Sequence, residues 1–208
     1  MTENVNKSMR SSAFQYWSLG CNIVLLKDKK PLNEWQRWIK ERQTEKEFDA
    51  LPWDEATQYG LVCGTKLDNG LFLAVIDYDV KNLSSEVIEK GREALKKLPI
   101  TRMEETPSSG LHYVYLSKTK PQTISAFHNE AALELLGESK LCICWPSQNY
   151  KRLNDNDLTT LQNLESLFFD ALSSVGVEAK KKSQVWFDRE DLTAKPYRRI
   201  ILYAYASF

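Results

Sequence analysis

The sequence has few of the cysteines and histidines that structural zinc sites and disulfide-rich proteins need, and it lacks the long apolar runs of membrane proteins. Its 208 residues include four cysteines and two histidines, and none of the cysteines forms a C-x-x-C pair (Cys21, Cys63, Cys142, Cys144). We therefore expect neither a structural zinc site nor disulfides, but a reduced intracellular chain. The sequence also has no signal peptide and no apolar run of about 18 residues, so we expect a soluble, cytoplasmic protein that makes no membrane contact.

An excess of charge of either sign is also absent. The chain carries 28 basic and 28 acidic residues, for a formal net charge of zero. A protein that coats nucleic acid through bulk charge is strongly basic, so that class is excluded, and a role on nucleic acid needs local basic patches and a metal ion. The strongest basic runs are Lys27/Lys29/Lys30 and 180–182, for which a solvated face is the usual explanation.

The remaining composition supports one compact domain. Hydrophobic residues make up 42% of the chain, which is enough for a substantial core. The region 178–183 is charged and poor in apolar residues, as linkers are. We predict a catalytic domain over residues 1–177, followed over 178–208 by a linker and a C-terminal segment that either packs back on the core or begins a further domain.

The most informative segment of the sequence is an apolar run that ends in two aspartates. Leu71–Ile76 are six consecutive apolar residues that predict a strand buried on both faces, and the run ends in Asp77, Tyr78 and Asp79. Strand side chains alternate, so Asp77 and Asp79 leave the same face about 7 Å apart at their Cα atoms. A divalent cation such as Mg²⁺ or Mn²⁺ would offset their repulsion. The alternative is that the strand simply surfaces into a polar turn.

Three further places hold candidate site residues. In the turn Ser108, Ser109, Gly110, the glycine lets backbone N–H groups approach an anion and the hydroxyls add donors, and His112 follows on a strand. Taken alone, this segment is more typical of an ordinary hairpin turn with a half-buried histidine. Glu134 lies between two leucines on a strand and needs either a buried partner or a solvent-facing position.

The fourth candidate follows the last apolar strand. Trp145 and Ser147 belong to a W-P-S sequence at its end, and Tyr150, Lys151 and Arg152 come shortly after. An aromatic ring and a hydroxyl at a strand end suit a base or sugar, while the basic pair suits a phosphate. A capped strand end is the alternative explanation.

Local patterns also predict the connecting elements. The spacing of Trp35, Trp38 and Ile39 predicts an amphipathic helix over 34–49. The turn signal 68–70 predicts a hairpin that leads from the strand 59–64 into the strand before Asp77. Serine and aspartate caps predict helices over 84–97 and 157–172.

The order of these motifs resembles the primase-polymerase domain of the archaeo-eukaryotic primase superfamily, of the type found in archaeal plasmids, phages and mobile elements. The series is K-K-P-L-x-x-W, G-L-V-C-G, D-Y-D, T-P-S-S-G-L-H, Glu134 and W-P-S, and the resemblance covers roughly residues 14–172. Ser109 stands where many relatives carry a second glycine, no Cys/His insertion marks a zinc stem, and no helicase follows. The resemblance implies an α/β (α+β) fold: an RRM-like, largely antiparallel catalytic sheet packed with an N-terminal α/β unit, and a site in the cleft between two sheets.

The resemblance also implies roles for the motif residues. Asp77, Asp79 and Glu134 match the metal-binding carboxylates, which would hold two Mg²⁺ or Mn²⁺ ions. Ser109 and His112, with Ser108 beside them, match the motif that holds the phosphates of the incoming nucleotide. Trp145, Ser147, Tyr150 and Lys151 complete the expected nucleotide-binding set.

The implied function is a DNA primase and DNA polymerase that acts in replication of a plasmid, virus or mobile element. Its partners would be a single-stranded DNA template with its primer, nucleoside triphosphates and a replicative helicase. Two alternatives stay open from the residues alone. A metal-dependent nuclease could use the same carboxylates, and a non-catalytic single-strand-binding module for replication initiation could use the aromatic residues to stack bases.

Overall fold

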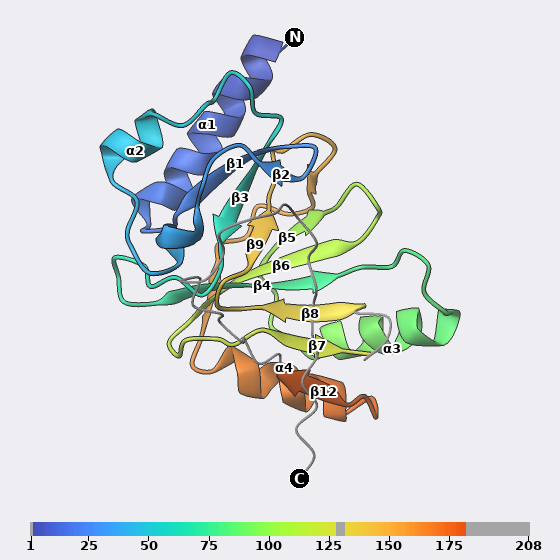
Figure 1. Ribbon diagram of the computed structural model, residues 1–208. Coiled ribbons are helices and arrows are strands. Elements are labelled where there is room, and N and C mark those ends of the chain that lie inside the picture. The colour runs from blue at the N-terminus through green and yellow to red at the C-terminus, as the bar shows by residue number, and fades with distance from the viewer. Residues whose placement is uncertain (1, 128–131, 182–208) are drawn as a thin grey trace, which may run out of the picture.

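The computed structural model describes residues 2–127 and 132–181, which form two sheets with helices outside each (Figure 1). The larger sheet has eight strands in the order β10-β5-β6-β4-β8-β7-β12, with β11 beside β6. The smaller sheet has four strands in the order β2-β1-β3-β9. This mixture of helices and mainly antiparallel strands confirms the α+β class.

The centre of the large sheet is a split βαβ unit. Strand β4 (Phe72–Tyr78) leads into helix α3 (Ser85–Leu95), which returns the chain to β5 (Arg102–Glu105), and β6 (Leu111–Ser117) then pairs antiparallel between β4 and β5. Strand β8 (Leu133–Leu136) covers the other edge of β4. The order β5-β6-β4-β8 is the arrangement expected of an RRM-like sheet.

Short strands extend the large sheet on both sides. Strand β7 (Ile124–Ala126) pairs with β8, and β12 (Ala179–Lys181) pairs with β7. On the other side, β10 (Lys151–Arg152) pairs with β5, and β11 (Thr159–Leu161) runs parallel to β6 beyond the end of β5.

The small sheet belongs to an N-terminal unit. It consists of β1 (Ile23–Lys27), β2 (Lys30–Pro31), β3 (Gln58–Val62) and β9 (Leu141–Ile143). Helix α1 (Thr2–Ser18), the short helix α2 (Glu45–Asp49) and the 3₁₀ turn η1 (Gln36–Ile39) surround it (Figure 1). Strand β9 follows β8 of the large sheet in the sequence and pairs with β3, so it ties the small sheet to the large one.

The alternation of β4 separates two apolar cores. Ala74, Ile76 and Tyr78 pack with α3 and with α4 (Leu164–Ser173), which lie on one face of the large sheet. Leu73 and Val75 leave the opposite face and pack with residues of the small sheet. A strand buried on both faces is what the run 71–76 predicted, and Asp77 continues the face that looks toward the small sheet.

The structure corrects the predicted helix over 34–49. Only η1 and α2 are helical in this region. The side-chain amide of Asn22 donates to the carbonyls of Trp38 and Glu41 at 2.6 and 2.7 Å, so it binds carbonyls that a continuous helix would use itself. Thr44 then starts α2 afresh with a capping box to Glu47.

The predicted hairpin between the second strand and β4 is also wrong. Strand β3 pairs with β1 and β9 in the small sheet, whereas β4 pairs with β6 and β8 in the large one. The turn at 68–70 does form, with Gly70 at a φ of +82°, but it closes only a local bridge between Lys66 and Phe72. Both edges of β3 and of β4 are already occupied, which leaves no edge through which they could pair.

Of the two helices predicted nearer the C-terminus, the first is confirmed and the second is shorter than predicted. Helix α3 confirms the prediction over 84–97, with the Ser84 hydroxyl as its cap. The helix predicted over 157–172 begins only at Leu164, because Asn163 caps it and residues 159–161 form β11 instead.

The sheet continues past the predicted domain boundary. Strand β12 includes residues of the region 178–183 that we predicted as a linker, and it pairs in register with β7. The segment 182–208 lies outside the described residues, so the division of the chain at 177 stays a prediction. Within the part of the chain that the structure describes, none of the helices has the length and apolar character needed to cross a bilayer.

Candidate active site

A row of polar residues crosses five neighbouring strands of the large sheet. In register, Glu104 on β5 lies opposite His112 on β6, which lies opposite Asp77 on β4. Asp77 in turn lies opposite Glu134 on β8, which lies opposite Ser125 on β7. Directly opposite residues of antiparallel strands project from the same face with Cβ atoms about 4.5–5.5 Å apart. We call these five residues the polar row.

The polar row lies where the apolar core between the two sheets ends. Val75 is fully buried in that core, whereas the next residue on its face, Asp77, has a side chain that is 33% exposed. Asp77 is therefore both anchored in a buried strand and open to solvent. A carboxylate held in this way can meet a ligand without the full cost of burial.

His112 links Asp77 to the small sheet. Its Nε2 lies 3.4 Å from Oδ1 of Asp77, and its Nδ1 lies 3.5 Å from the sulfur of Cys142 on β9. The ring is 5% exposed and packs beside the ring of Tyr150, with centroids 5.9 Å apart. Contacts on both nitrogens and on the ring leave the imidazole little freedom to rotate.

Glu134 lies on the other side of Asp77. The hydroxyl of Ser125 donates a hydrogen bond to its Oε1, and the side chain is partly exposed between the buried Leu133 and Leu135. The sequence left open whether Glu134 has a partner or faces solvent. The structure shows a partner and a place directly opposite Asp77.

Asp79 continues the same face at the end of β4. Its backbone N–H donates to the carbonyl of Ala132 at 2.9 Å, and its Oδ1 accepts a hydrogen bond from the N–H of Lys81 at 2.9 Å. The turn 106–110 lies against this strand end, because a Cβ built on Gly110 would be 2.5 Å from the carbonyl oxygen of Tyr78 and 3.4 Å from the Cα of Asp79. The structure thus brings the second motif next to the first.

The exposed serines lie at the tip of this turn. Ser109 has a φ of +63°, and its N–H donates to the carbonyl of Thr106 at 3.0 Å. The hydroxyl of Ser108 lies 3.2 Å from that of Thr106. Both serines face solvent beside the carboxylates, where an anion could reach them.

The close approach at Gly110 gives a prediction about stability. Gly110→Ala should lower the free energy of unfolding by about 1–3 kcal/mol, because the added methyl group meets fixed backbone. Ser108→Ala, in the same turn but exposed, should stay within about 0.5 kcal/mol of the wild type. Urea denaturation of the two variants measures this, and equal stabilities would show that the turn does not press on β4.

The predicted nucleotide-binding residues that follow β9 differ in exposure. Ser147 is 1% exposed, and its hydroxyl accepts from the N–H of Tyr59 at 2.9 Å and contacts the Tyr59 carbonyl at 3.2 Å. It therefore fixes the loop to β3 and does not face the site. The Lys151 ammonium, by contrast, is exposed and pairs with Glu105 at 3.1 Å.

Trp145 and Tyr150 lie at a polar hollow of about 440 Å³ beside the row, which they line with Lys151, Arg152 and residues 153–155. The guanidinium of Arg152 lies 5.5 Å from the centre of the Trp145 ring. An aromatic ring with an adjacent cation suits stacking on a base next to a phosphate.

Sequence reasoning missed two residues of the site, Glu104 and Cys142. Glu104 is 1% exposed, and its Oε2 accepts a hydrogen bond from the N–H of Trp145 at 2.9 Å. It stands in a mostly polar strand, so no local pattern marks it as buried. Cys142 on β9 and Cys144 just beyond its end alternate along the chain, a pattern that indicates only a strand face. Knowledge of the strand pairing is needed to find either.

Burial raises the pKa of Glu104, although the N–H of Trp145 and the charges of His112, Arg102 and Arg152 oppose the shift. An acid with a raised pKa binds more protons in the folded state than in the unfolded chain between the two pKa values. The free energy of unfolding should therefore fall as pH rises from the ordinary range of a glutamate through the raised pKa.

Glu104→Gln should remove this part of the pH dependence while keeping an acceptor for Trp145. We expect the stability of the wild type, relative to Glu104→Gln, to decline across this pH range in urea denaturation. A difference between the two proteins that grows with pH would contradict the assignment.

Three carboxylates of the site are suitable ligands for a divalent ion, because of their chemistry and because they project from the same face of the sheet. Asp77, Asp79 and Glu134 offer the hard oxygen donors that Mg²⁺ and Mn²⁺ prefer, and all three project from one face of the sheet. In the conformation described, no three His, Cys, Asp or Glu side chains among residues 2–127 and 132–181 converge on one point. Side-chain rotation at exposed Asp79 and half-exposed Asp77 and Glu134 is needed to bring them together.

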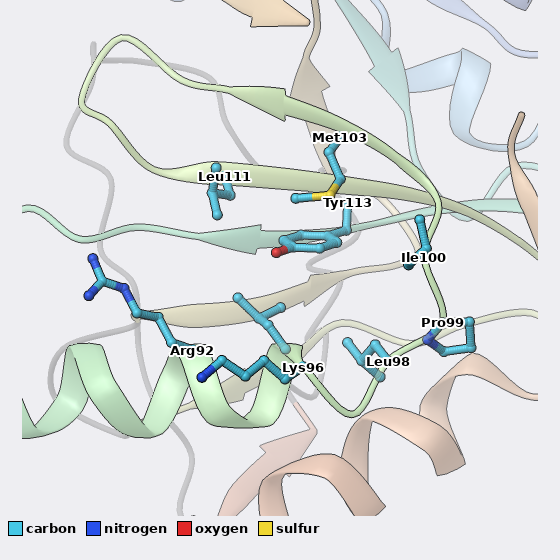
Figure 2. Close-up of a pocket in the computed structure, with 9 residues that line it drawn as sticks. Arg92, Lys96, Leu98, Pro99, Ile100, Met103, Leu111 and Tyr113 are labelled. Atoms are coloured by element: carbon cyan, nitrogen blue, oxygen red, sulfur yellow. The ribbon is translucent and has the colours of Figure 1, made fainter. Parts of the chain in front are cut away.

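An apolar hollow on the opposite face of the sheet is separate from this site (Figure 2). It has a volume of about 350 Å³, and Leu98, Met103, Leu111 and Tyr113 line it together with Arg92 and Lys96 of α3. Leu111 and Tyr113 alternate with His112 on β6, so they point away from the polar row. None of the predicted site residues reaches this hollow.

The described chain combines an RRM-like sheet, with carboxylates and a histidine in register, and an N-terminal α/β unit. The family model described as "Bifunctional DNA primase/polymerase, N-terminal" (Prim-Pol) matches residues 13–165, and the chain belongs to this family, which implies a nucleotidyltransferase-type enzyme in general. A comparison with curated proteins finds no match. Membership supports a DNA primase/polymerase-type function with DNA and nucleotides as substrates, and the family is in general metal-dependent.

Proposed function

We propose that this chain is a template-directed DNA primase and polymerase that uses two divalent ions, in the replication of a plasmid, virus or mobile element. The observation that supports this most is the register of His112, Asp77 and Glu134 on three neighbouring strands. These residues are far apart in the sequence but lie side by side on one face of the sheet. The turn that carries Ser109 lies beside them. We propose that the enzyme is cytoplasmic.

The carboxylates of Asp77, Asp79 and Glu134 would hold the ions, Mg²⁺ or Mn²⁺. When bound, such a pair activates the primer 3′-hydroxyl and stabilises the charge on the leaving pyrophosphate. The protein side chains supply position: Asp77 is fixed by a buried strand, and Ser125 orients Glu134 through its hydrogen bond. Rigid placement matters because phosphoryl transfer depends mainly on geometry and electrostatics.

The nucleotide would lie between the polar row and the turn 106–110. The Nε2–H of His112 would donate to a phosphate oxygen in place of the Asp77 carboxylate. Ser108 and Ser109 would add hydroxyl and backbone N–H donors. Trp145, Tyr150 and Lys151 would contact the base, the sugar and a phosphate from the neighbouring hollow. Ser147 would act indirectly, by fixing this loop to β3.

The partners that we propose are a single-stranded template with its primer, and a replicative helicase as the source of single strands. With no net charge to attract DNA, template binding by this chain should be weak and strongly reduced by salt. Binding that is tight and insensitive to salt would contradict this part of the proposal.

The experiment offers the purified chain a primed single-stranded template, labelled nucleotides and Mn²⁺ or Mg²⁺, with a chelator as control. We expect incorporation that follows the template and stops on chelation. Release of mononucleotides from DNA without added nucleotide would instead identify a nuclease. Binding of single strands without incorporation, and unaffected by the metal, would identify a non-catalytic module.

A further inference from the structure

His112 has a hydrogen-bonding partner behind it that neither the family motifs nor the proposed function uses. Its Nδ1 lies 3.5 Å from the sulfur of Cys142, while its Nε2 faces Asp77. Both side chains are almost fully buried, with 5% of His112 and 2% of Cys142 exposed. The contact joins the two sheets, since His112 is on β6 and Cys142 on β9.

A neutral imidazole carries one proton, and the partner of one nitrogen decides which nitrogen has it. A donor opposite Nδ1 leaves the proton on Nε2. An acceptor opposite Nδ1 would draw the proton to that side, and Nε2 would then have nothing to donate to a phosphate. The Asp77 carboxylate beside Nε2 favours the same tautomer, so the Cys142 thiol adds to a preference that Asp77 also supports, and it matters most when a phosphate replaces Asp77 as the partner of Nε2.

The surroundings of Cys142 keep its proton in place. A hydrogen bond involving Cys144, whose sulfur lies 3.9 Å away, together with burial raises the pKa of the Cys142 thiol well above its usual range. The S–H group is thus a donor with three possible acceptors: Nδ1 of His112 at 3.5 Å, the carbonyl of Ile143 at 3.7 Å and the sulfur of Cys144 at 3.9 Å. The ring nitrogen is the closest of the three.

We propose that Cys142 is a positioning residue that donates to Nδ1 of His112 and so helps to keep the imidazole proton on Nε2, aimed at the nucleotide phosphates. The role in nucleotide binding rests on the proposed function, whereas the tautomer itself does not. The two parts can therefore be tested separately.

The tautomer is measured directly by NMR. The chain has only two histidines, so His128→Gln assigns the signals of His112 in long-range ¹H–¹⁵N spectra. We expect the proton on Nε2 in the wild type and in Cys142→Ser, which keeps a donor, and a measurably larger Nδ1–H population in Cys142→Ala, where only Asp77 supports the Nε2–H form. A proton on Nδ1 in the wild type, or an unchanged Nδ1–H population in Cys142→Ala, would overturn the proposal.

The functional part is measured by nucleotide kinetics with a matched control. Cys142→Ala should raise KM for the nucleotide about tenfold with a smaller change in kcat, and Cys142→Ser should restore most of it. Cys21→Ala deletes another fully buried thiol, in the core around the small sheet, so it should lose stability without this change in KM. Equal KM values in the two alanine variants would overturn the functional role. Complete inactivity of the wild type would count against the proposed function, while the NMR result still decides the tautomer.

Discussion

Asp77→Asn should reduce metal-dependent nucleotide incorporation by at least about a thousandfold while the chain stays folded. The substitution keeps the shape of the side chain and removes its charge. Asp77 stands between His112 and Glu134, so it is the residue through which the proposed ions, the phosphates and the primer would meet. A metal ion contributes several kcal/mol to such a reaction, and about 4 kcal/mol corresponds to a factor of one thousand.

Asp49→Asn is the matched control for this variant. Asp49 lies at the end of α2 in the N-terminal unit, its side chain is 57% exposed, and it pairs with Arg10 at 2.8 Å. We expect nearly full activity from it. Thermal unfolding should show that both variants are folded at the assay temperature, and substantial activity in a folded Asp77→Asn protein would remove Asp77 from the metal site.

Glu134→Gln should have the second largest effect, a loss of at least about a hundredfold in kcat. The amide keeps an oxygen that accepts the hydrogen bond from Ser125, but it lacks the charge needed to share a divalent ion with Asp77. We expect the loss to be partly relieved by Mn²⁺ at high concentration, because a weakened site fills again by mass action.

Glu138→Gln, two residues beyond the end of the same strand, is the control. Glu138 pairs with Lys120 at the surface at 2.6 Å, and its substitution should leave kcat unchanged. If both glutamate variants keep wild-type activity, Glu134 does not bind the metal and the third carboxylate must be sought elsewhere. If both lose activity equally, the effect is structural.

Local patterns were sufficient to predict the strand that carries the site. The six apolar residues of 71–76 and the alternation into Asp77 and Asp79 led to a strand buried on both faces, and β4 is such a strand. Helix α3 followed from its serine cap for the same reason. In both cases the signal depends on neighbours in the sequence.

Features that depend on pairing between distant segments were not predictable from the residues alone. The sequence does not show that Glu134 lies opposite Asp77, because a shift of one residue in register would turn Glu134 to the other face. The resemblance to primase-polymerases implied that they meet, and the register of β4 and β8 agrees with it. Glu104 and Cys142 have no such motif, so they became visible only with the strands paired.

Distant hydrogen bonds also change what a local pattern suggests. Asn22 binds the carbonyls of Trp38 and Glu41 and so interrupts a segment whose spacing predicted one helix, which was wrong. The hydroxyl of Ser147 contacts the backbone of Tyr59 twice, and its role in nucleotide binding stays a prediction. A polar side chain near a predicted site can stabilise the structure around that site instead of contacting its ligand.

The most direct measurement of the central claim is a crystal structure with a nucleoside triphosphate and Mn²⁺, with the ions located by their anomalous scattering. We predict Mn²⁺ bound by oxygens of Asp77, Asp79 and Glu134 at about 2.0–2.3 Å, with the triphosphate against His112 and the turn 106–110. Manganese bound away from these three carboxylates, or a triphosphate on another face of the sheet, would contradict the proposed polymerase site.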